Sequence, residues 1–309
     1  MKKTLNFIFG FIAILAMMLV SCDGVEDGAT YNVTVSANAH GTVIIENYSG
    51  NSVDIPVGSN VKLIAVPNEN SYFAGWYVDN DSKPIATNET FLLWVIKPTV
   101  VKAVFNKYPE AIDLGLSSGI KWAEFNIGAN TPTEYGDYFA WGETKKKTDF
   151  TWDNYVWCKG SAYTILKYCD NNTYGSFDCK ILLDLEDDVA NATLGGEWRM
   201  PTIEEQKELL NECTWEWTTV DDVNGYKATG PNGNSIFFPA AGFRYGKELY
   251  DTGRRGCYWA ATLTSDYCYK ACGLGLYDSA FEYNENDQYN YGWYYYDRYL
   301  GHTVRPVCK

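Results

Sequence analysis

The sequence predicts a mainly β protein with few helices, of the α+β class, in which a small antiparallel β-module precedes a larger domain. Three observations lead to this prediction. The chain has 309 residues, enough for two domains of about 100–200 residues each. Short runs of β-branched and aromatic residues recur between Gly, Pro, Asn and Asp, as in strands joined by turns. A helical spacing of apolar residues is found in only two segments.

The chain is acidic, which bears on its partners. Lys and Arg number 25 and Asp and Glu 39, so the formal net charge is 25 − 39 = −14. A protein that binds phosphates neutralises them with clustered basic side chains, and the one basic run is Lys145-Lys146-Lys147. We therefore expect no nucleic-acid partner. With 46% hydrophobic and 16% aromatic residues, the composition also excludes a disordered acidic tail and a coiled coil.

Residues 1–21 have the pattern of a secretory signal peptide. Two lysines precede an apolar stretch over 7–20, which is shorter than the ~20 residues of a membrane-spanning helix. Its end, Leu19-Val20-Ser21-Cys22, resembles the lipobox of bacterial lipoproteins. The resemblance implies cleavage before Cys22, lipidation of its thiol and a stable membrane anchor, followed by a tether over 22–28. A plain signal peptide and an N-terminal anchor helix are the alternatives.

The acidic residues Asp23, Glu26 and Asp27 follow the lipobox directly. They resemble the surface-export signals of Bacteroidetes lipoproteins, which implies an outer-membrane protein, lipid-anchored and exposed at the cell surface. A flexible acidic linker has the same composition and is the alternative.

The β-module is predicted over 29–107, because this segment has no helical period and contains five runs in which apolar and polar residues alternate. The runs are 31–35, 42–45, 61–66, 91–96 and 100–105. Four further stretches stand out, at Gly41-Thr42-Val43, 57–67, Tyr72-Phe73-Ala74-Gly75-Trp76 and Lys102-Ala103-Val104-Phe105. Together they resemble the divergent internalin-type B-repeat, which implies a spacer or adhesion module of a bacterial surface protein. Trp76 and Tyr77 are expected in the core, with an exposed sugar-stacking pair as the alternative.

The segment 110–309 contains a series of Gly- and aromatic-rich motifs, at 112–123, 126–129, 135–143, 195–202, 238–244, 258–260 and 303–308. With these motifs the segment resembles the major paralogous domain of Fibrobacter succinogenes, which is abundant in Bacteroidetes surface lipoproteins. The resemblance implies a C-type lectin-like fold. The Glu-Pro-Asn and Trp-Asn-Asp motifs of sugar-binding C-type lectins are absent from the sequence, which argues against calcium-dependent lectin activity.

Two helices are predicted in this second domain. Thr202 followed by Glu205 forms a capping box, in which each side chain bonds the other residue's backbone N–H. The helix is expected over 202–212, with Ile203, Leu209, Leu210 and Cys213 on one face. A second helix is expected around 181–192, where three apolar residues share a face.

Eight cysteines remain once Cys22 is set aside, since 9 − 1 = 8. An even number in an exported chain permits up to four disulfides, whose connectivity the sequence leaves open. Buried reduced thiols are the alternative. Cys268 and Cys272 lack the second matching pair of a structural zinc site. We expect no metal and no cofactor.

The acidic run Glu186-Asp187-Asp188 predicts a solvated face with one carboxylate paired to Arg199 or Arg305, since adjacent helical residues point to different faces. Acid–base catalysis or a bound cation is the alternative. A second oxygen-rich stretch over 282–287 lacks the ligand spacing of an EF-hand loop.

The candidate ligand-binding residues are Tyr289, Tyr291, Trp293 and Tyr295, because 13 of the 25 tyrosines fall within 245–299 and Tyr suits both half-buried strands and recognition surfaces. Strand alternation puts Tyr291, Trp293 and Tyr295 on one face and Tyr294 and Tyr296 on the other. The triplet Asp278-Ser279-Ala280 resembles a Bacteroidetes O-glycosylation signal, which implies a glycan on Ser279.

The sequence favours a non-enzymatic surface lipoprotein that binds an extracellular glycan or protein. Gly-x-Ser-x-Gly, His-Glu-x-x-His and a phosphate loop are all absent. The stretch 198–205 resembles a segment of formylglycine-generating oxidases, but we cannot place the catalytic cysteine pair of that family on the cysteines of this chain. A structural or accessory subunit of a surface assembly is the alternative, and it predicts an open sheet edge for strand addition.

Overall fold

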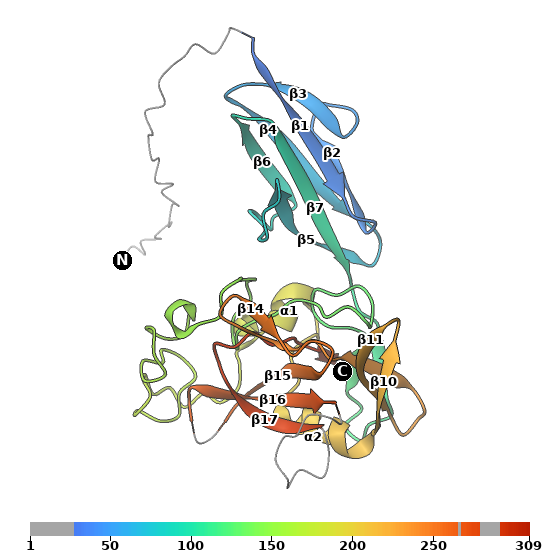
Figure 1. The fold of residues 1–309 in the computed structure, drawn as a ribbon, viewed down its shortest axis with the longest axis vertical. Coiled ribbons are helices and arrows are strands. Elements are labelled where there is room, and N and C mark those ends of the chain that lie inside the picture. Colours follow the sequence, from blue (N-terminus) through green and yellow to red (C-terminus); the bar gives the residue numbers. More distant parts are fainter. Residues whose placement is uncertain (1–27, 265–266, 279–290) are drawn as a thin grey trace, which may run out of the picture.

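The computed structural model describes residues 28–264, 267–278 and 291–309. The predicted signal peptide, Cys22, Ser279 and Tyr289 lie outside these ranges. The described chain forms a β-module joined to a larger second domain (Figure 1) and is mainly β, which confirms the predicted class. Within it, no helix is long and apolar enough to cross a membrane.

Seven strands build the β-module as two facing sheets, in the orders β3-β1-β7-β5 and β2-β4-β6. Their alternate residues fill one core, in which Trp76 is fully buried and donates its indole N–H to the Asn88 carbonyl. The expectation that Trp76 belongs to the core is confirmed, whereas Tyr77 is only half-buried and is not part of this core. The strands are β1 (Thr30–Ala37), β2 (Gly41–Ile45), β3 (Ser52–Pro56), β4 (Ser59–Pro67), β5 (Ser71–Val78), β6 (Thr90–Val95) and β7 (Thr99–Lys107).

One strand pair departs from the antiparallel prediction. β1 and β7 run parallel, from Val33 opposite Thr99 to Ala37 opposite Ala103. The other pairs of the module are antiparallel. The parallel pair is possible because five strands separate β1 from β7 along the chain, whereas parallel pairing requires a connection of only about a dozen residues or more.

Two strands, β3 and β5, were not among the predicted runs. In β5 the register against β7 shifts between Phe73 and Gly75, which marks a bulge. Gly75 has a φ of +150°, and a Cβ built there would lie 2.6 Å from Cβ of Pro84. The position therefore requires glycine, and this glycine interrupts the sequence pattern of the strand.

The described part of the second domain forms four small sheets, in the orders β10-β11-β12, β13-β14, β15-β16-β17 and β18-β9-β8. Loops join them, and Trp122, Trp141 and Trp259 are fully buried in the cores between them. The strands are β8 (Ala111–Asp113), β9 (Lys121–Ala123), β10 (Thr214–Val220), β11 (Val223–Thr229), β12 (Ser235–Pro239), β13 (Phe243–Tyr245), β14 (Glu248–Tyr250), β15 (Arg255–Leu263), β16 (Lys270–Tyr277), β17 (Tyr291–Asp297) and β18 (Val307–Cys308).

The helix α2 (Ile203–Glu212) begins at the predicted capping box. The Thr202 hydroxyl accepts the Glu205 N–H at 3.3 Å, and the Glu205 carboxylate accepts the Thr202 N–H at 2.8 Å. Glu205 also pairs with Arg199. The face that carries Ile203 and Leu209 is buried against the domain. This prediction is confirmed.

The second predicted helix is shorter than expected. A 3-10 turn, η2 (Leu185–Asp187), precedes α1 (Val189–Leu194). Asp188 caps α1, because its carboxylate accepts the N–H groups of Ala190 and Asn191 at 2.9 and 3.1 Å and that of Met200 at 2.8 Å. A capping residue has extended backbone dihedrals, so the helix begins after Asp188.

The predicted pairing of the acidic run with Arg199 or Arg305 was wrong. Arg199 pairs with Glu205. Arg305 is buried and has no carboxylate partner among the described residues. Its guanidinium donates to the Asn126 side chain and to main-chain carbonyls, among them that of Phe237 at 2.8 Å. Burial lowers the pKa of Arg305 to about 10.

Replacement of Asp188 by Ala is expected to lower the free energy of unfolding by about 3 kcal/mol, because one N-cap is lost and buried N–H groups are left without an acceptor. Urea unfolding measures this. Glu186→Ala, in the same acidic run but exposed, is the matched control and should change stability by less than about 0.5 kcal/mol. Equal effects of the two substitutions would contradict the capping role.

His302 makes stability pH-dependent. It is fully buried and stacks on Trp259 with ring centroids 4.1 Å apart. Neither of its ring nitrogens has a hydrogen-bond partner among the described residues. Burial, and then the charge of Arg255, hold the pKa of His302 well below 6.5. Below pH 6.5, His302 is therefore protonated in the unfolded chain but stays neutral in the folded protein. The free energy of unfolding thus decreases as the pH drops below 6.5.

Between pH 7.5 and pH 5 the unfolding free energy of the parent should decrease by up to about 2 kcal/mol more than that of His302→Phe. The variant keeps an aromatic ring at this position but does not titrate. Urea titrations at both pH values measure the difference. The same pH dependence in both proteins would assign the acid sensitivity to other groups.

Candidate functional site

The predicted aromatic face of β17 is present. β17 pairs antiparallel with β16, and its side chains alternate between the core and the surface. Tyr296 is buried in the core and Tyr294 packs against it. On the opposite face, Trp293 is 44% exposed and Tyr295 is 40% exposed. The predicted alternation is thus confirmed.

Tyr291 shares the face of Trp293 but lies in a different environment. Its ring stacks on Trp215 at a centroid distance of 5.4 Å and meets Tyr226 edge-on at 5.5 Å. Trp215 lies on β10 and Tyr226 on β11, so Tyr291 packs between two sheets at the margin of a buried cluster. The exposed part of the predicted site is therefore Trp293 with Tyr295, which we call the aromatic pair.

Helix α2 supplies charged neighbours to the aromatic pair. The two rings lie 5.5 Å apart at 62°, and the Lys207 ammonium lies 5.2 Å from the Trp293 ring. Lys207 also forms an ion pair with Glu204 at 2.9 Å. Exposed rings beside hydrogen-bonding charges can stack on an apolar ligand face and bond its hydroxyl groups.

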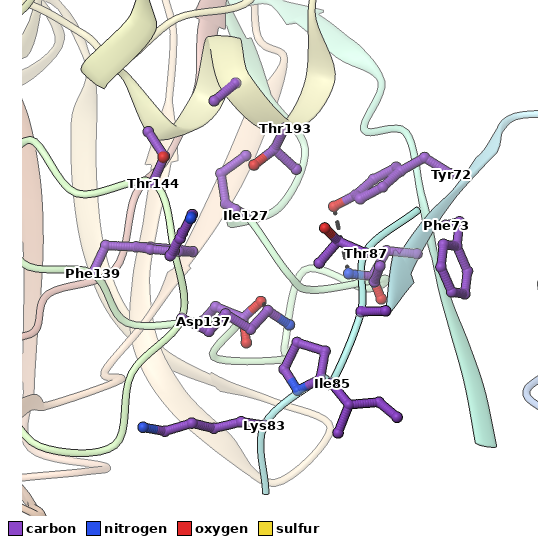
Figure 2. A pocket seen from close by; sticks show the side chains of 17 residues that line it. Tyr72, Phe73, Lys83, Ile85, Thr87, Ile127, Asp137, Phe139, Thr144 and Thr193 are labelled. Atoms are coloured by element: carbon purple, nitrogen blue, oxygen red, sulfur yellow. Dashed lines mark hydrogen bonds and ion pairs between the residues drawn. The ribbon is translucent and has the colours of Figure 1, made fainter. Parts of the chain in front are cut away.

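A cavity of about 610 Å³ lies between the β-module and the second domain, within the range of small-molecule sites. Figure 2 shows Tyr72 and Thr87 of the β-module across from Ile127, Thr144 and Thr193 of the second domain. The cavity draws on segments far apart in the sequence, so no single sequence motif indicates it.

The cavity is positively charged. Asp137 is paired with Lys146 at 2.7 Å, while Lys83 and Lys145 have no ion-pair partner in the part of the chain that the structure describes. Burial alone would lower the pKa of Lys146, but the charge of Asp137 outweighs burial and raises it. Burial raises the pKa of Tyr72, whose hydroxyl accepts from the Asn106 amide at 3.4 Å. This balance favours anionic over cationic occupants.

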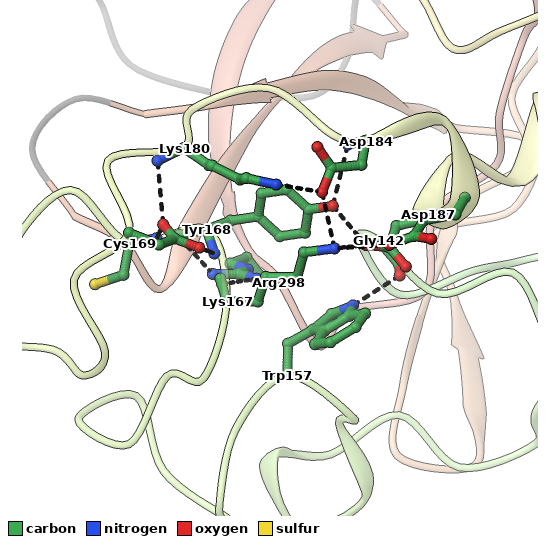
Figure 3. A network of polar contacts seen from close by, with 11 residues as sticks. Gly142, Trp157, Lys167, Tyr168, Cys169, Lys180, Asp184, Asp187 and Arg298 are labelled. Atoms are coloured by element: carbon green, nitrogen blue, oxygen red, sulfur yellow. Dashed lines mark hydrogen bonds and ion pairs between the residues drawn. The ribbon is translucent and has the colours of Figure 1, made fainter. Parts of the chain in front are cut away.

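The acidic run belongs to an ion-pair network centred on Lys167 (Figure 3). The carboxylates of Asp184, Glu186 and Asp187 lie close enough together to hold a cation. However, the Lys167 ammonium lies 2.9, 3.4 and 2.6 Å from them, respectively. Lys180 also bonds Asp184, and the two lysines lower the pKa of Asp184 to about 2. The three carboxylates are thus neutralised by Lys167 and Lys180. The spacing of these residues in the sequence did not indicate this pairing.

The eight described cysteines are free thiols, and no two are at disulfide distance. Cys179 is exposed and the other seven are buried. Burial raises the pKa of Cys213 to about 11 and that of Cys272 to about 12, so these thiols are poor nucleophiles at neutral pH.

Comparison with known proteins gives a match, which covers the β-module. Residues 31–109 match the family model described as "Divergent InlB B-repeat domain". No curated protein and no solved structure matches the chain. The finding agrees with the resemblance noted for residues 29–107 and indicates a surface or adhesion-type module in the N-terminal part of the chain.

Proposed function

We propose that this protein is a cell-surface lipoprotein, lipid-anchored through Cys22 in the outer membrane, that binds an extracellular glycan without catalysis. The aromatic pair Trp293–Tyr295 carries the proposal. It combines two exposed rings with Lys207 and Glu204 on one surface, while the rest of the tyrosine-rich strand packs into or against the core.

The chemistry of the aromatic pair suits a sugar. The apolar C–H face of a pyranose stacks on an indole or phenol ring, and the sugar hydroxyls bond charged groups at its edge. Lys207 and Glu204 stand at that edge. Trp and Tyr also lose little conformational entropy on binding, because each has two side-chain torsions.

The β-module fits the role of a spacer. The B-repeat match supports a surface protein, and the lipobox-like Leu19-Val20-Ser21-Cys22 supports attachment by lipid. In the proposed arrangement the acylated N-terminus holds the protein at the membrane, and the β-module carries the second domain outward.

A non-catalytic role is supported by the structural role of the stretch that resembles the formylglycine-generating oxidases. Residues 198–205 form the turn and capping box at the start of α2, so their residue types have a structural explanation. Of the two histidines, His302 is buried in the core and stacks on Trp259, where it cannot reach a ligand.

The proposal is tested on a glycan array with the mature lipoprotein in detergent. The signal of a bound glycan should fall at least tenfold in Trp293→Ala, as expected for an aromatic anchor, and should also fall in Tyr295→Ala. Trp94→Ala, at a comparably exposed Trp of the β-module, is the matched control and should bind like the parent. A calcium chelator should leave the signal unchanged.

Undiminished binding by Trp293→Ala would remove the aromatic pair from recognition. A folded parent that binds no glycan on the array would overturn glycan binding and leave a protein ligand or an assembly role.

A second candidate, a subunit of a surface assembly, is favoured by strand β6. Among the described residues β6 pairs with β4 alone, and on its outward face Leu92 is 60% exposed and Trp94 55% exposed. Ile96 follows at the end of the strand and is also exposed. An edge strand with exposed apolar side chains is a template for strand addition or sheet stacking.

Self-association through β6 predicts that the parent sediments as an oligomer at micromolar concentration and that Trp94→Lys sediments as a monomer. Trp293→Lys, which adds the same charge elsewhere, should remain oligomeric. A monomeric parent, or equal loss in the two variants, would contradict assembly through β6.

A further inference from the structure

One pair of cysteines in the second domain is in contact. Cys169 lies in the loop after η1 (Trp152–Asn154), and Cys268 lies just before β16; both are fully buried in one cluster. Both sulfur atoms face the same carbonyl oxygen, that of Asn171, at 3.0 Å from Cys169 and 3.7 Å from Cys268. The Cys268 thiol also donates to the Asp170 carboxylate at 3.1 Å, and burial, followed by the proximity of Cys169 and Asp170, raises the pKa of Cys268.

A single guanidinium holds the two backbone segments together. Arg298, fully buried, donates from Nη1 to the carbonyl of Tyr168 at 3.1 Å and to the carbonyl of Cys268 at 2.9 Å. Its Nη2 donates to the Lys167 carbonyl at 3.0 Å. Figure 3 shows Arg298 beside Lys167, Tyr168 and Cys169. One guanidinium thus binds both Tyr168, which precedes Cys169, and Cys268.

The Cys169 side is fixed a second time. The Asp178 carboxylate accepts the N–H of Tyr168 at 2.7 Å and the N–H of Cys169 at 2.8 Å. The cysteine positions are therefore set by bonds that do not involve their own sulfur atoms. These bonds hold the backbone on both sides of the cysteine pair whether or not the two sulfurs are joined.

The sulfur atoms of three other cysteines point away from this pair. Cys158 lies in the same cluster, but its sulfur bonds the Trp152 carbonyl at 3.2 Å. The sulfur of Cys272 faces the Leu263 carbonyl at 3.7 Å. Cys179 touches Cys169 through its backbone N–H, while its own side chain is exposed.

We propose that Cys169 and Cys268 form a disulfide in the exported protein. The exchange partner is an oxidised dithiol protein or a small-molecule disulfide. The thiolate of one cysteine attacks that disulfide and releases one thiol. The thiolate of the second cysteine then displaces the other thiol from the mixed disulfide. The two cysteines lose two protons and two electrons in total, and the oxidant becomes two thiols. The step takes place during folding, before the cluster closes over the sulfurs.

The test uses the mature protein, unfolded in urea with reductant and refolded in a glutathione redox buffer. After alkylation and digestion without reduction, mass spectrometry should find the peptides of Cys169 and Cys268 joined and two hydrogen masses lighter than the separate thiols. Because a defined oxidant is supplied, the result does not depend on the proposed export. Cys213→Ser, a buried cysteine outside the cluster, is the control and should retain the link.

A second measurement guards against misfolded variants. Reduction should lower the melting temperature of the parent by roughly 5–10 °C, since the bond closes a long loop. The double variant Cys169→Ser/Cys268→Ser should melt at the same temperature with and without reductant. Alkylation of both thiols in refolded protein, or a link from Cys268 to Cys158 or Cys179, would overturn the assignment.

Discussion

The second domain depends on buried arginines that bind main-chain carbonyls. Much of this domain is loop, and a loop packed in the interior brings carbonyl groups that have no strand or helix partner. Arg298 serves three such groups together with the Tyr155 hydroxyl, and its guanidinium lies over the Trp141 ring. Arg305 binds carbonyls of three further residues from two segments and stacks on Phe238. A planar group with five donors can do this, and an ammonium cannot.

This arrangement explains which features the sequence could predict. The start of α2 depends on residues three positions apart, and the alternation of β17 depends on the two-residue period of a strand, so both can be read from a short window. The partners of Arg298 and Arg305 lie far away in the sequence, 130 residues away for Tyr168 with Arg298 and 182 for Ala123 with Arg305. Even Cys268 and Phe237 are 30 and 68 residues away. No spacing rule links them, which is why the sequence assigned carboxylates to Arg199 and Arg305 and missed Lys167 as the partner of Asp187.

The candidate site shows the same limit. Alternation correctly separated Trp293 and Tyr295 from Tyr296, because that property is local. It could not separate Tyr291 from the other two, since its burial depends on Trp215 and Tyr226 in another sheet. The cavity between the β-module and the second domain and the contact between Cys169 and Cys268 could not be predicted from the sequence either. Each depends on residues that only the tertiary structure brings together.

The parallel pairing of β1 with β7 affects how the β-module bears load. The chain enters at one end of the β1–β7 pair and leaves at the other, toward the second domain (Figure 1). A pull between an anchored N-terminus and a held ligand would act along both strands in opposite directions. The hydrogen bonds between Val33–Ala37 and Thr99–Ala103 would then be sheared together rather than opened one after another, so a small module can transmit tension without unzipping.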